Sequence, residues 1–291
     1  MAHIVNPVKV TEASDLFYAQ PITFKSMQCA KEFSLEKIDV TLYAVNFYED
    51  DSVVPEYFSK CDYLKRSILD FGEFSAKKKL PLISDILYSL KDVKVDYIVY
   101  TNVDIGLLPY FYEYVLNKIQ SGSDTLVINR RIISNDPHRT MAEMFSEIGS
   151  PHIGYDCFVF KKELIEKFNL GNVCIGANWI GRAFISNLIA HSKKVEIIKD
   201  KHLTFHLGQD TVWMSKKYLD YDLHNRNELK KIISDLLNEC KTDYSRNELI
   251  EINNYLDDWY KSKDHVSKNG ISLTLYRRII SFLSSFKNFF S

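Results

Sequence analysis

The sequence predicts an α/β protein built on a mixed, mostly parallel sheet flanked by helices, with a helical extension at its C-terminal end. Short apolar, β-branched segments alternate with segments of helical periodicity through the first half of the chain. Such alternation is typical of parallel sheets with right-handed crossovers. Residues 97–100 form a continuous apolar run, as expected of a central strand that is buried on both faces.

The elements of the first half follow from local patterns. Apolar residues at helical spacing, such as Phe24, Met27 and Ala30, predict a helix over residues 21–33. Gly106 and Pro109 separate the central strand from the helix that follows it. We expect strands over residues 3–8, 40–47, 97–100 and 125–133, and helices over residues 21–33, 82–90 and 110–119. Residues 67–74 fit either a short third strand or an irregular loop.

The second half of the chain is less regular. We expect strands over residues 155–160, 195–198 and 202–207, and helices over residues 161–168, 182–191 and 218–260. Residues 1–215 are therefore assigned to the α/β domain and residues 216–291 to the helical extension.

The tail, residues 270–291, has the composition of a basic amphipathic helix. It carries Arg277, Arg278 and Lys287 among regularly spaced Phe, Leu and Ile residues, and it contains no acid. Such a helix can lie on an anionic membrane, near a lipid-linked acceptor. Alternatively, its phenylalanines pack back onto the globule or across a homodimer interface.

Composition excludes several classes of protein. The net charge of -1 gives no field that would attract nucleic acid. The five cysteines are odd in number and form no Cys-x-x-Cys pair, so reduced thiols in a cytoplasmic protein are expected. We expect no signal peptide and no membrane span, because no stretch reaches about 18 apolar residues. If the tail binds lipid, the protein would lie at the inner face of the plasma membrane.

Asn102 and Asp104 follow the central strand directly. Ligands of open α/β sheets bind at the carboxyl ends of the strands. One acid there can hold a divalent cation, and the cation can hold a diphosphate. The alternative is that Asp104 only caps the following turn or helix.

Two further groups of polar residues lie at predicted strand ends. Arg130 and Arg131 could receive a diphosphate or an acidic sugar by bidentate hydrogen bonds, or belong to a surface ion-pair network. His152 and Asp156 precede a strand, where a carboxylate can bind or deprotonate an acceptor hydroxyl. Turn formation around Gly154 explains them equally well.

His202, Thr204 and His206 share one face of a predicted strand, because side chains alternate along a strand. His206 is the candidate metal ligand among them, although a single histidine is more often a bonded core or surface residue. Trp179, which lies between Gly176 and Gly181, is a further candidate for contact with a substrate.

Together, the strand order, Thr-Asn-Val-Asp at residues 101–104, Gly-Tyr-Asp-Cys-Phe-Val-Phe at residues 154–160 and the late His-Leu-Gly resemble a glycosyltransferase of the GT-A fold. The resemblance covers about residues 3–210. It implies that a nucleotide-diphosphate sugar lies over a Rossmann-like sheet. An Asp-x-Asp motif and a late histidine of that class hold Mn²⁺ or Mg²⁺, which bridges the diphosphate.

The resemblance assigns roles to individual residues. Asn102 and Asp104 match the Asp-x-Asp positions, and His206 matches the late histidine. Asp156 matches the region of the base or acceptor-binding acid. Asn6 and Pro7, at the end of the first strand, would contact the base and ribose of the nucleotide.

Two departures from the pattern leave alternatives open. Asn102 replaces the first Asp of the motif, and His206-Leu207-Gly208 is one residue shorter than His-x-x-Gly. A metal-independent site or an inactive one is therefore an alternative to a metal site.

The resulting hypothesis is a glycosyltransferase that moves a sugar from a nucleotide-sugar donor to a glycan or lipid-linked acceptor in bacterial surface polysaccharide assembly. A sugar-nucleotide nucleotidyltransferase is one alternative, but residues 7–20 contain no glycine and a single lysine, unlike a triphosphate-binding loop. The other alternative is a non-catalytic glycan-binding or scaffold protein with a decayed site.

Overall fold

The computed structural model describes residues 1–152, 154–209 and 216–269. The tail at residues 270–291, for which the sequence predicts a membrane or packing contact, lies outside the described residues.

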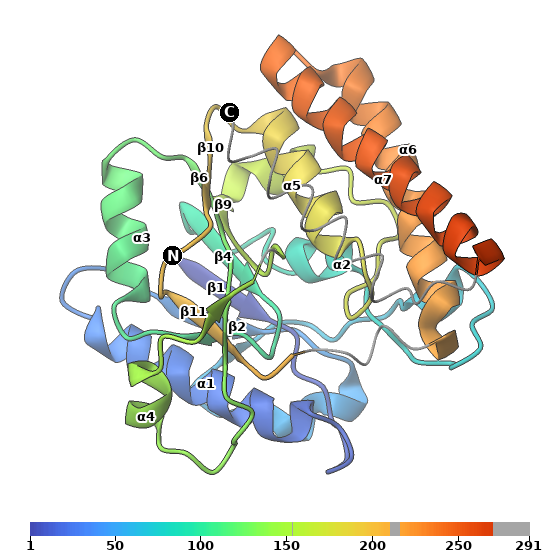
Figure 1. Ribbon diagram of the computed structural model, residues 1–291. Coiled ribbons are helices and arrows are strands. Elements are labelled where there is room, and N and C mark those ends of the chain that lie inside the picture. The colour runs from blue at the N-terminus through green and yellow to red at the C-terminus, as the bar shows by residue number, and fades with distance from the viewer. Residues whose placement is uncertain (153, 210–215, 270–291) are drawn as a thin grey trace.

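The centre of the molecule is a seven-stranded sheet in the order β10-β6-β9-β4-β1-β2-β3 (Figure 1). Its strands are β1 (Ala2–Val5), β2 (Thr41–Ala44), β3 (Ser59–Lys60), β4 (Tyr97–Thr101), β6 (Thr125–Ile128), β9 (Cys157–Lys161) and β10 (Val195–Ile198). All neighbours pair in parallel except β9, which is antiparallel to β4 and β6. The predicted α/β class with a mixed, mostly parallel sheet is confirmed.

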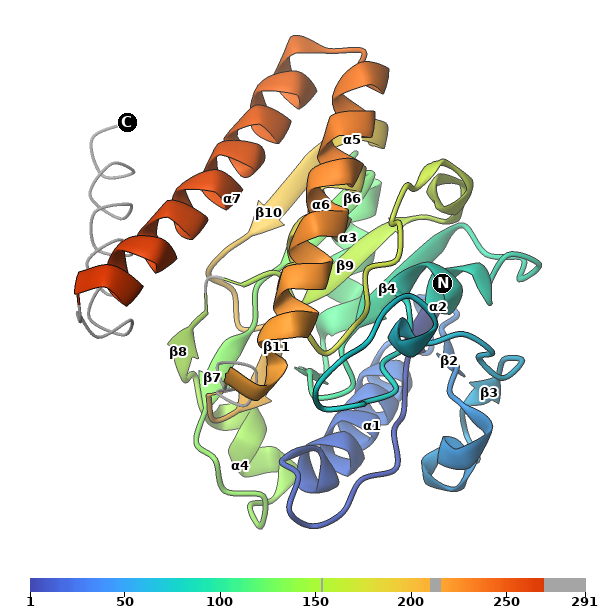
Figure 2. The ribbon, with the colours of Figure 1, turned by 90° about the vertical axis from the view of Figure 1, so that its right-hand side faces the viewer.

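Helices cover both faces of this sheet, as Figures 1 and 2 show. The α-helices are α1 (Leu16–Phe33), α2 (Ile83–Tyr88), α3 (Phe111–Gln120), α4 (Met141–Ser146), α5 (Ile180–His191), α6 (Leu219–Glu239) and α7 (Asp243–Asn269). Short 3-10 helices are η1 (Tyr48–Val53), η2 (Ile68–Asp70), η3 (Lys162–Lys167) and η5 (Lys216–Tyr218).

Alternation along the strands divides the core into two layers. Ile98 and Tyr100 of β4 belong to a core shared with α2, α5, α6 and α7. Val99, between them, belongs to the core on the other face, which α1 and α3 complete. The central strand is therefore buried on both sides, as its continuous apolar sequence predicts.

A smaller sheet in the order β5-β11-β7-β8 lies beside the main one. Its strands are β5 (Gly106–Leu107), β7 (Arg131–Ile133), β8 (Ser150–Pro151) and β11 (Thr204–Leu207). The prediction of one strand over residues 125–133 is therefore wrong. The chain leaves the main sheet after Ile128, where Asn129 N–H still donates to Ile198, and joins the second sheet at Arg131, opposite Phe205.

Three other expectations need correction. Residues 67–74 contain no strand but the 3-10 helix η2, whose N-terminus is capped by a capping box between Ser67 and Asp70. The third strand is instead β3, which the sequence did not predict. The predicted helix at residues 161–168 is the 3-10 helix η3. Helix α1 begins at Leu16, before Pro21, and the Gln20 side chain bonds the backbone of Val8 and of Leu16.

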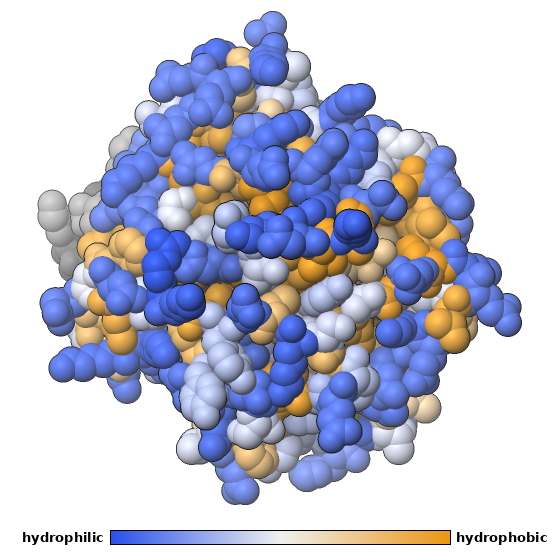
Figure 3. All heavy atoms as spheres, turned by 180° about the vertical axis from the view of Figure 1, so that it is seen from behind, coloured by the Kyte–Doolittle hydropathy of each residue, from blue (hydrophilic) through white to orange (hydrophobic). Residues whose placement is uncertain are grey.

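The C-terminal helices pack onto α5 and add to the same core (Figure 2). No helix in the described part of the chain has an apolar stretch long enough to cross a bilayer. Seen from behind, polar and charged residues cover most of the surface, with hydrophobic residues showing between them (Figure 3).

Candidate active site at the carboxyl edge of the sheet

The register of three strands brings distant polar residues to one place. Cys157, the first residue of β9, pairs with Thr101 at the end of β4 and with Ile128 at the end of β6. Because β9 runs antiparallel to both strands, the residues that follow β4 and β6 lie beside the residues that precede β9. Asp104, Arg130 and Asp156 come from these three segments.

Asp104 lies next to His206. The smaller sheet sets this contact, because β11 pairs with β5, which begins two residues after Asp104, and with β7, which begins directly after Arg130. His206 Nε2 is 3.4 Å from Asp104 Oδ2, and His206 Nδ1 is 2.9 Å from the carbonyl oxygen of Gly208. A carbonyl can only accept, so Nδ1 carries a proton. Nε2 donates to Asp104 when the ring is protonated, and its lone pair is available to a metal ion when the ring is neutral.

The two groups shift each other's pKa. Burial alone raises the pKa of Asp104, but the contact and charge of His206, with the charge of Arg130, outweigh it and lower the pKa. Burial lowers the pKa of His206, whereas the contact and charge of Asp104 outweigh it and raise the pKa. Each group therefore favours the charged form of the other.

Asp156 is held by Arg130 in a buried ion pair. Arg130 Nη1 donates to Asp156 Oδ1 at 3.0 Å, and both side chains are about nine-tenths buried. His152 Nδ1 lies 3.4 Å from Asp156 Oδ2, but it accepts from the N–H of Gly154 at 2.9 Å. In the tautomer that accepts this bond, Nδ1 has no proton for Asp156.

Several buried atoms of this cluster have no hydrogen-bond partner among the described residues. They are Asp104 Oδ1, Asp156 Oδ2, Arg130 Nε and Asn129 Oδ1. An unpaired buried polar atom costs about 1–3 kcal/mol, so such atoms in one place indicate a site for a ligand, ion or water. In the sequence, Asn129 stands beside Arg130 and Arg131 at a predicted strand end, but only the arginines were given a binding role.

Among the other predicted site residues, Asn102 lies two residues before Asp104 in the chain. Its Oδ1 accepts from the hydroxyl of Tyr100 at 3.1 Å. Asn6 and Pro7 are buried at the carboxyl end of β1, where Asn6 Nδ2 donates to Val45 at 2.7 Å. Trp179 is buried at the start of α5.

The structure does not bring Arg131 to the cluster. Its guanidinium pairs with Asp200 and donates to the carbonyl oxygens of Ile148 and Gly149. Arg131 is the first residue of β7 and pairs with Phe205 and Pro151 in the smaller sheet, whereas Arg130 precedes the strand.

The expected common face of His202, Thr204 and His206 needs correction. The strand begins only at Thr204, and His202 lies in the turn before it. Thr204 Oγ1 donates to the carbonyl oxygen of Asn129 at 3.4 Å. Thr204 thus ties β11 to the segment that carries Arg130, and His206 alone of the three reaches Asp104.

The donors present fit the protein side of a Mn²⁺ or Mg²⁺ site that a diphosphate completes. A carboxylate and an imidazole are both ligands that such ions accept. Asp104 Oδ2 and His206 Nε2 lie 3.4 Å apart, and Asp104 Oδ1 has no described hydrogen-bond partner. Within the described residues no group of three His, Cys, Asp or Glu side chains gathers for a metal. The remaining ligands would be the Asn102 amide, water or substrate oxygens.

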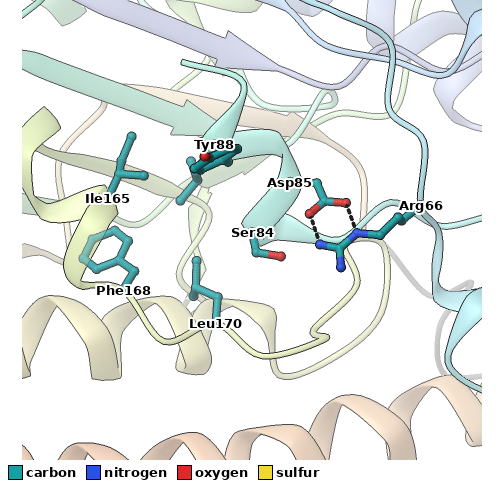
Figure 4. A pocket seen from close by; sticks show the side chains of 8 residues that line it. Arg66, Ser84, Asp85, Tyr88, Ile165, Phe168 and Leu170 are labelled. Carbon is teal, nitrogen blue, oxygen red and sulfur yellow. Dashed lines mark hydrogen bonds and ion pairs between the residues drawn. The ribbon is translucent and has the colours of Figure 1, made fainter. Parts of the chain in front are cut away.

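A separate cavity of about 320 Å³ lies between α2 and the segment that follows β9 (Figure 4). Arg66 and Asp85 form an ion pair on one side of it, and Tyr88, Phe168 and Leu170 contribute apolar lining. None of the predicted site residues lines it. Because β9 runs from Asp156 toward Lys161, this cavity lies toward the opposite edge of the sheet.

Comparison with known proteins gives similarity in structure only. No family model matches the sequence, and no curated protein matches it. Among solved structures, the chain is similar to S. aureus TarS 1–349 in complex with UDP-GlcNAc, with 9% identity and a TM-score of 0.47 over 83% of this chain and 74% of that one.

It is also similar to S. aureus TarS 1–349, with 10% identity and a TM-score of 0.47 over 94% and 92% of the two chains. For S. aureus TarS the identity is 10% and the TM-score 0.41, over 83% of this chain and 44% of that one. Such values assign neither a family nor an activity. What the structure itself shows is the α/β architecture expected from the sequence, a mixed, mostly parallel sheet with helices on both faces.

Proposed function

We propose that the chain is a glycosyltransferase that moves a sugar from a nucleotide-sugar donor to a glycan or lipid-linked acceptor. The observation that carries the proposal is the set of buried, unpartnered atoms of Asp104, Asp156, Arg130 and Asn129 at the carboxyl edge of the sheet. Ligands of open α/β sheets bind at this edge, and polar atoms without protein partners are available to them.

The roles follow from the contacts of each side chain. Asp104 and His206 would hold Mn²⁺ or Mg²⁺ where the diphosphate binds. Such an ion offsets the negative charge that develops on the departing nucleoside diphosphate. Asn6 and Pro7 stand at the end of β1, where the nucleoside would lie.

Asp156 presents Oδ2 to the acceptor. Its other oxygen, Oδ1, is fixed by Arg130 Nη1, so the carboxylate has one held and one unpartnered oxygen. Oδ2 would accept a hydrogen bond from the acceptor hydroxyl and take its proton if the reaction inverts the sugar. Arg130 Nε, also unpartnered, would donate to a phosphate or to an acidic sugar.

The test is a titration of UDP-, GDP- and CMP-sugars into the protein, with and without Mn²⁺, that follows binding by calorimetry and nucleotide release by chromatography. Asp104→Asn keeps the shape of the side chain but removes its charge. We expect it to lower turnover by about 100- to 1000-fold, as for the loss of one group that stabilises developing charge. The matched control is Asp92→Asn, an exposed position in the turn before β4.

Full turnover in Asp104→Asn would remove Asp104 from the reaction. Binding of a nucleotide-sugar without any release of nucleotide, even with excess saccharide, would favour the non-catalytic alternative. Release of pyrophosphate from a nucleoside triphosphate and a sugar phosphate would favour a nucleotidyltransferase.

A further inference from the structure

The first turn of α5 touches the chain next to Asp156. A Cβ on Gly181 would lie 2.8 Å from the carbonyl oxygen of Tyr155, the residue that precedes Asp156. Only glycine permits this approach. The residue before the helix, Trp179, has a left-handed backbone with φ of 77°, a conformation that costs a non-glycine residue energy and is common at functional sites.

Arg182 projects from this first turn toward α7. Its guanidinium carbon lies 3.9 Å from the centre of the Tyr255 ring, in the range of a cation–π contact. Arg66, Arg130, Arg131 and Arg139 each pair with an acid. The backbone carbonyl of Arg182 accepts from the Ser186 hydroxyl, but its guanidinium makes no hydrogen bond or ion pair with any residue that the structure describes. Its positive charge is therefore not neutralised by a described side chain.

Two aromatic rings complete the group. The rings of Trp179 and Tyr255 are 6.4 Å apart at 63°, and α7 packs against α5 along this side (Figures 1 and 2). The first turn of α5 contains no acid, so the partial positive charge of the helix N-terminus adds to that of Arg182. We name Trp179, Arg182 and Tyr255 the Arg182 cluster.

We infer that the Arg182 cluster is an acceptor subsite for a saccharide that carries a negatively charged group. The inference rests on the proposed function, because it places the acceptor beside Asp156. The guanidinium can pair bidentately with a carboxylate or phosphate. Trp179 is buried beneath the group, whereas Tyr255 is 41% exposed and offers an apolar surface to the sugar. The C-terminal extension then supplies one wall of the subsite through Tyr255.

The test measures binding to the full chain in the absence of any nucleotide. The probes are methyl β-D-glucuronide, glucose 6-phosphate and the neutral methyl β-D-glucoside. NMR spectra of the arginine Nε–H groups report the contact, and the Arg182 signal is assigned as the one absent from Arg182→Gln. We expect the anionic probes to shift this signal and to bind about tenfold more tightly than the neutral one. The two anionic probes distinguish carboxylate from phosphate as the recognised group.

Arg182→Gln should remove the preference for the charged probes, while Arg246→Gln, an exposed position in α7, should retain it. Thermal unfolding checks that both variants fold. Equal binding of charged and neutral probes, or an unchanged preference in Arg182→Gln, overturns the inference. The binding test does not depend on a nucleotide-sugar donor. If the charged probes bind at Arg182 but the protein transfers no sugar, only the proposed function is refuted. Transfer without this preference would refute only the subsite.

Discussion

Two groups of buried polar side chains in this protein differ in how many of their polar atoms have a hydrogen-bond partner. The first lies on α6. Asn225 accepts from the N–H of Cys174 at 2.9 Å and donates to the carbonyl oxygens of Cys174 and Asn178. Glu228 accepts from the N–H of Asn172 at 2.9 Å and pairs with Lys231. These side chains bond the segment before α5 to α6, and both ends of the Asn225 amide are occupied.

The second group lies at the carboxyl edge of the sheet. Asp104, Asp156, Arg130 and Asn129 are also largely enclosed, yet each keeps at least one buried atom without a described partner. Fully bonded buried polar groups stabilise one arrangement of the chain. Incompletely bonded ones cost free energy, and that cost is recovered when a ligand binds. The difference teaches which polar residues are fully used in positioning the chain and which ones keep atoms available for a further hydrogen bond.

The largest expected effect on stability tests the α6 group. Asn225→Ala leaves the buried N–H and C=O of Cys174 without their partner, at about 1–3 kcal/mol for each unpaired group. We expect the free energy of unfolding in urea to fall by about 2–4 kcal/mol. The same substitution at the exposed Asn254 of α7 is the control and should change it little. For Asp104→Asn we expect the opposite pattern: turnover is lost, while the free energy of unfolding stays close to that of the parent protein. If Asn225→Ala unfolds like the parent protein, the comparison fails.

His3 is a buried, hydrogen-bonded residue whose effect on stability depends on pH. His3 is fully buried, and its ring nitrogens lie 2.7 Å from the Tyr112 hydroxyl and 3.0 Å from the Thr101 hydroxyl. Burial lowers the pKa of His3 to about 3. Below about pH 6.5 the histidine binds a proton in the unfolded chain but not in the folded one. The contribution of neutral His3 to the free energy of unfolding is therefore fully present above pH 6.5 and is lost as the pH falls toward 3.

The loss should amount to about 1.4 kcal/mol per pH unit below pH 6.5. Urea unfolding at pH 7.0, 6.0 and 5.0 measures it. His3→Gln should flatten the slope relative to the parent, whereas His138→Gln, at a surface position, should not. Parallel curves for the parent and His3→Gln would show that His3 does titrate in the folded protein.

The smallest expected effect on stability is at the Arg66–Asp85 ion pair, in which two hydrogen bonds form but the arginine is largely exposed. Arg66 donates to Asp85 through Nε at 3.0 Å and through Nη2, yet the Arg66 side chain is 54% exposed. Solvent screens such pairs, which contribute about 0.2–1 kcal/mol. We expect Arg66→Gln to lower the free energy of unfolding by less than about 1 kcal/mol. A loss as large as that of Asn225→Ala would mean that burial is not what separates the two groups.

Much of the fold could be predicted from the sequence because it depends on local patterns. The continuous apolar run at residues 97–100 predicted a strand buried on both faces, and β4 is such a strand. Apolar spacing located α1, α3 and α5, with ends displaced by a few residues. The direction of β9 and the break between β6 and β7 were not predictable, because strand pairing depends on partners far away in the sequence.

The candidate site divides in the same way. The sequence by itself determined which chemistry was available: an acid after the central strand, a late histidine, adjacent arginines and Asp156 before a strand. Only the tertiary structure decided that Asp104 meets His206, that Arg130 pairs with Asp156 while Arg131 turns to Asp200, and that Arg182 has no acidic partner among the described residues. The physical reason is that side-chain type is local, whereas contacts and burial arise from the pairing of segments that can be 100 residues apart.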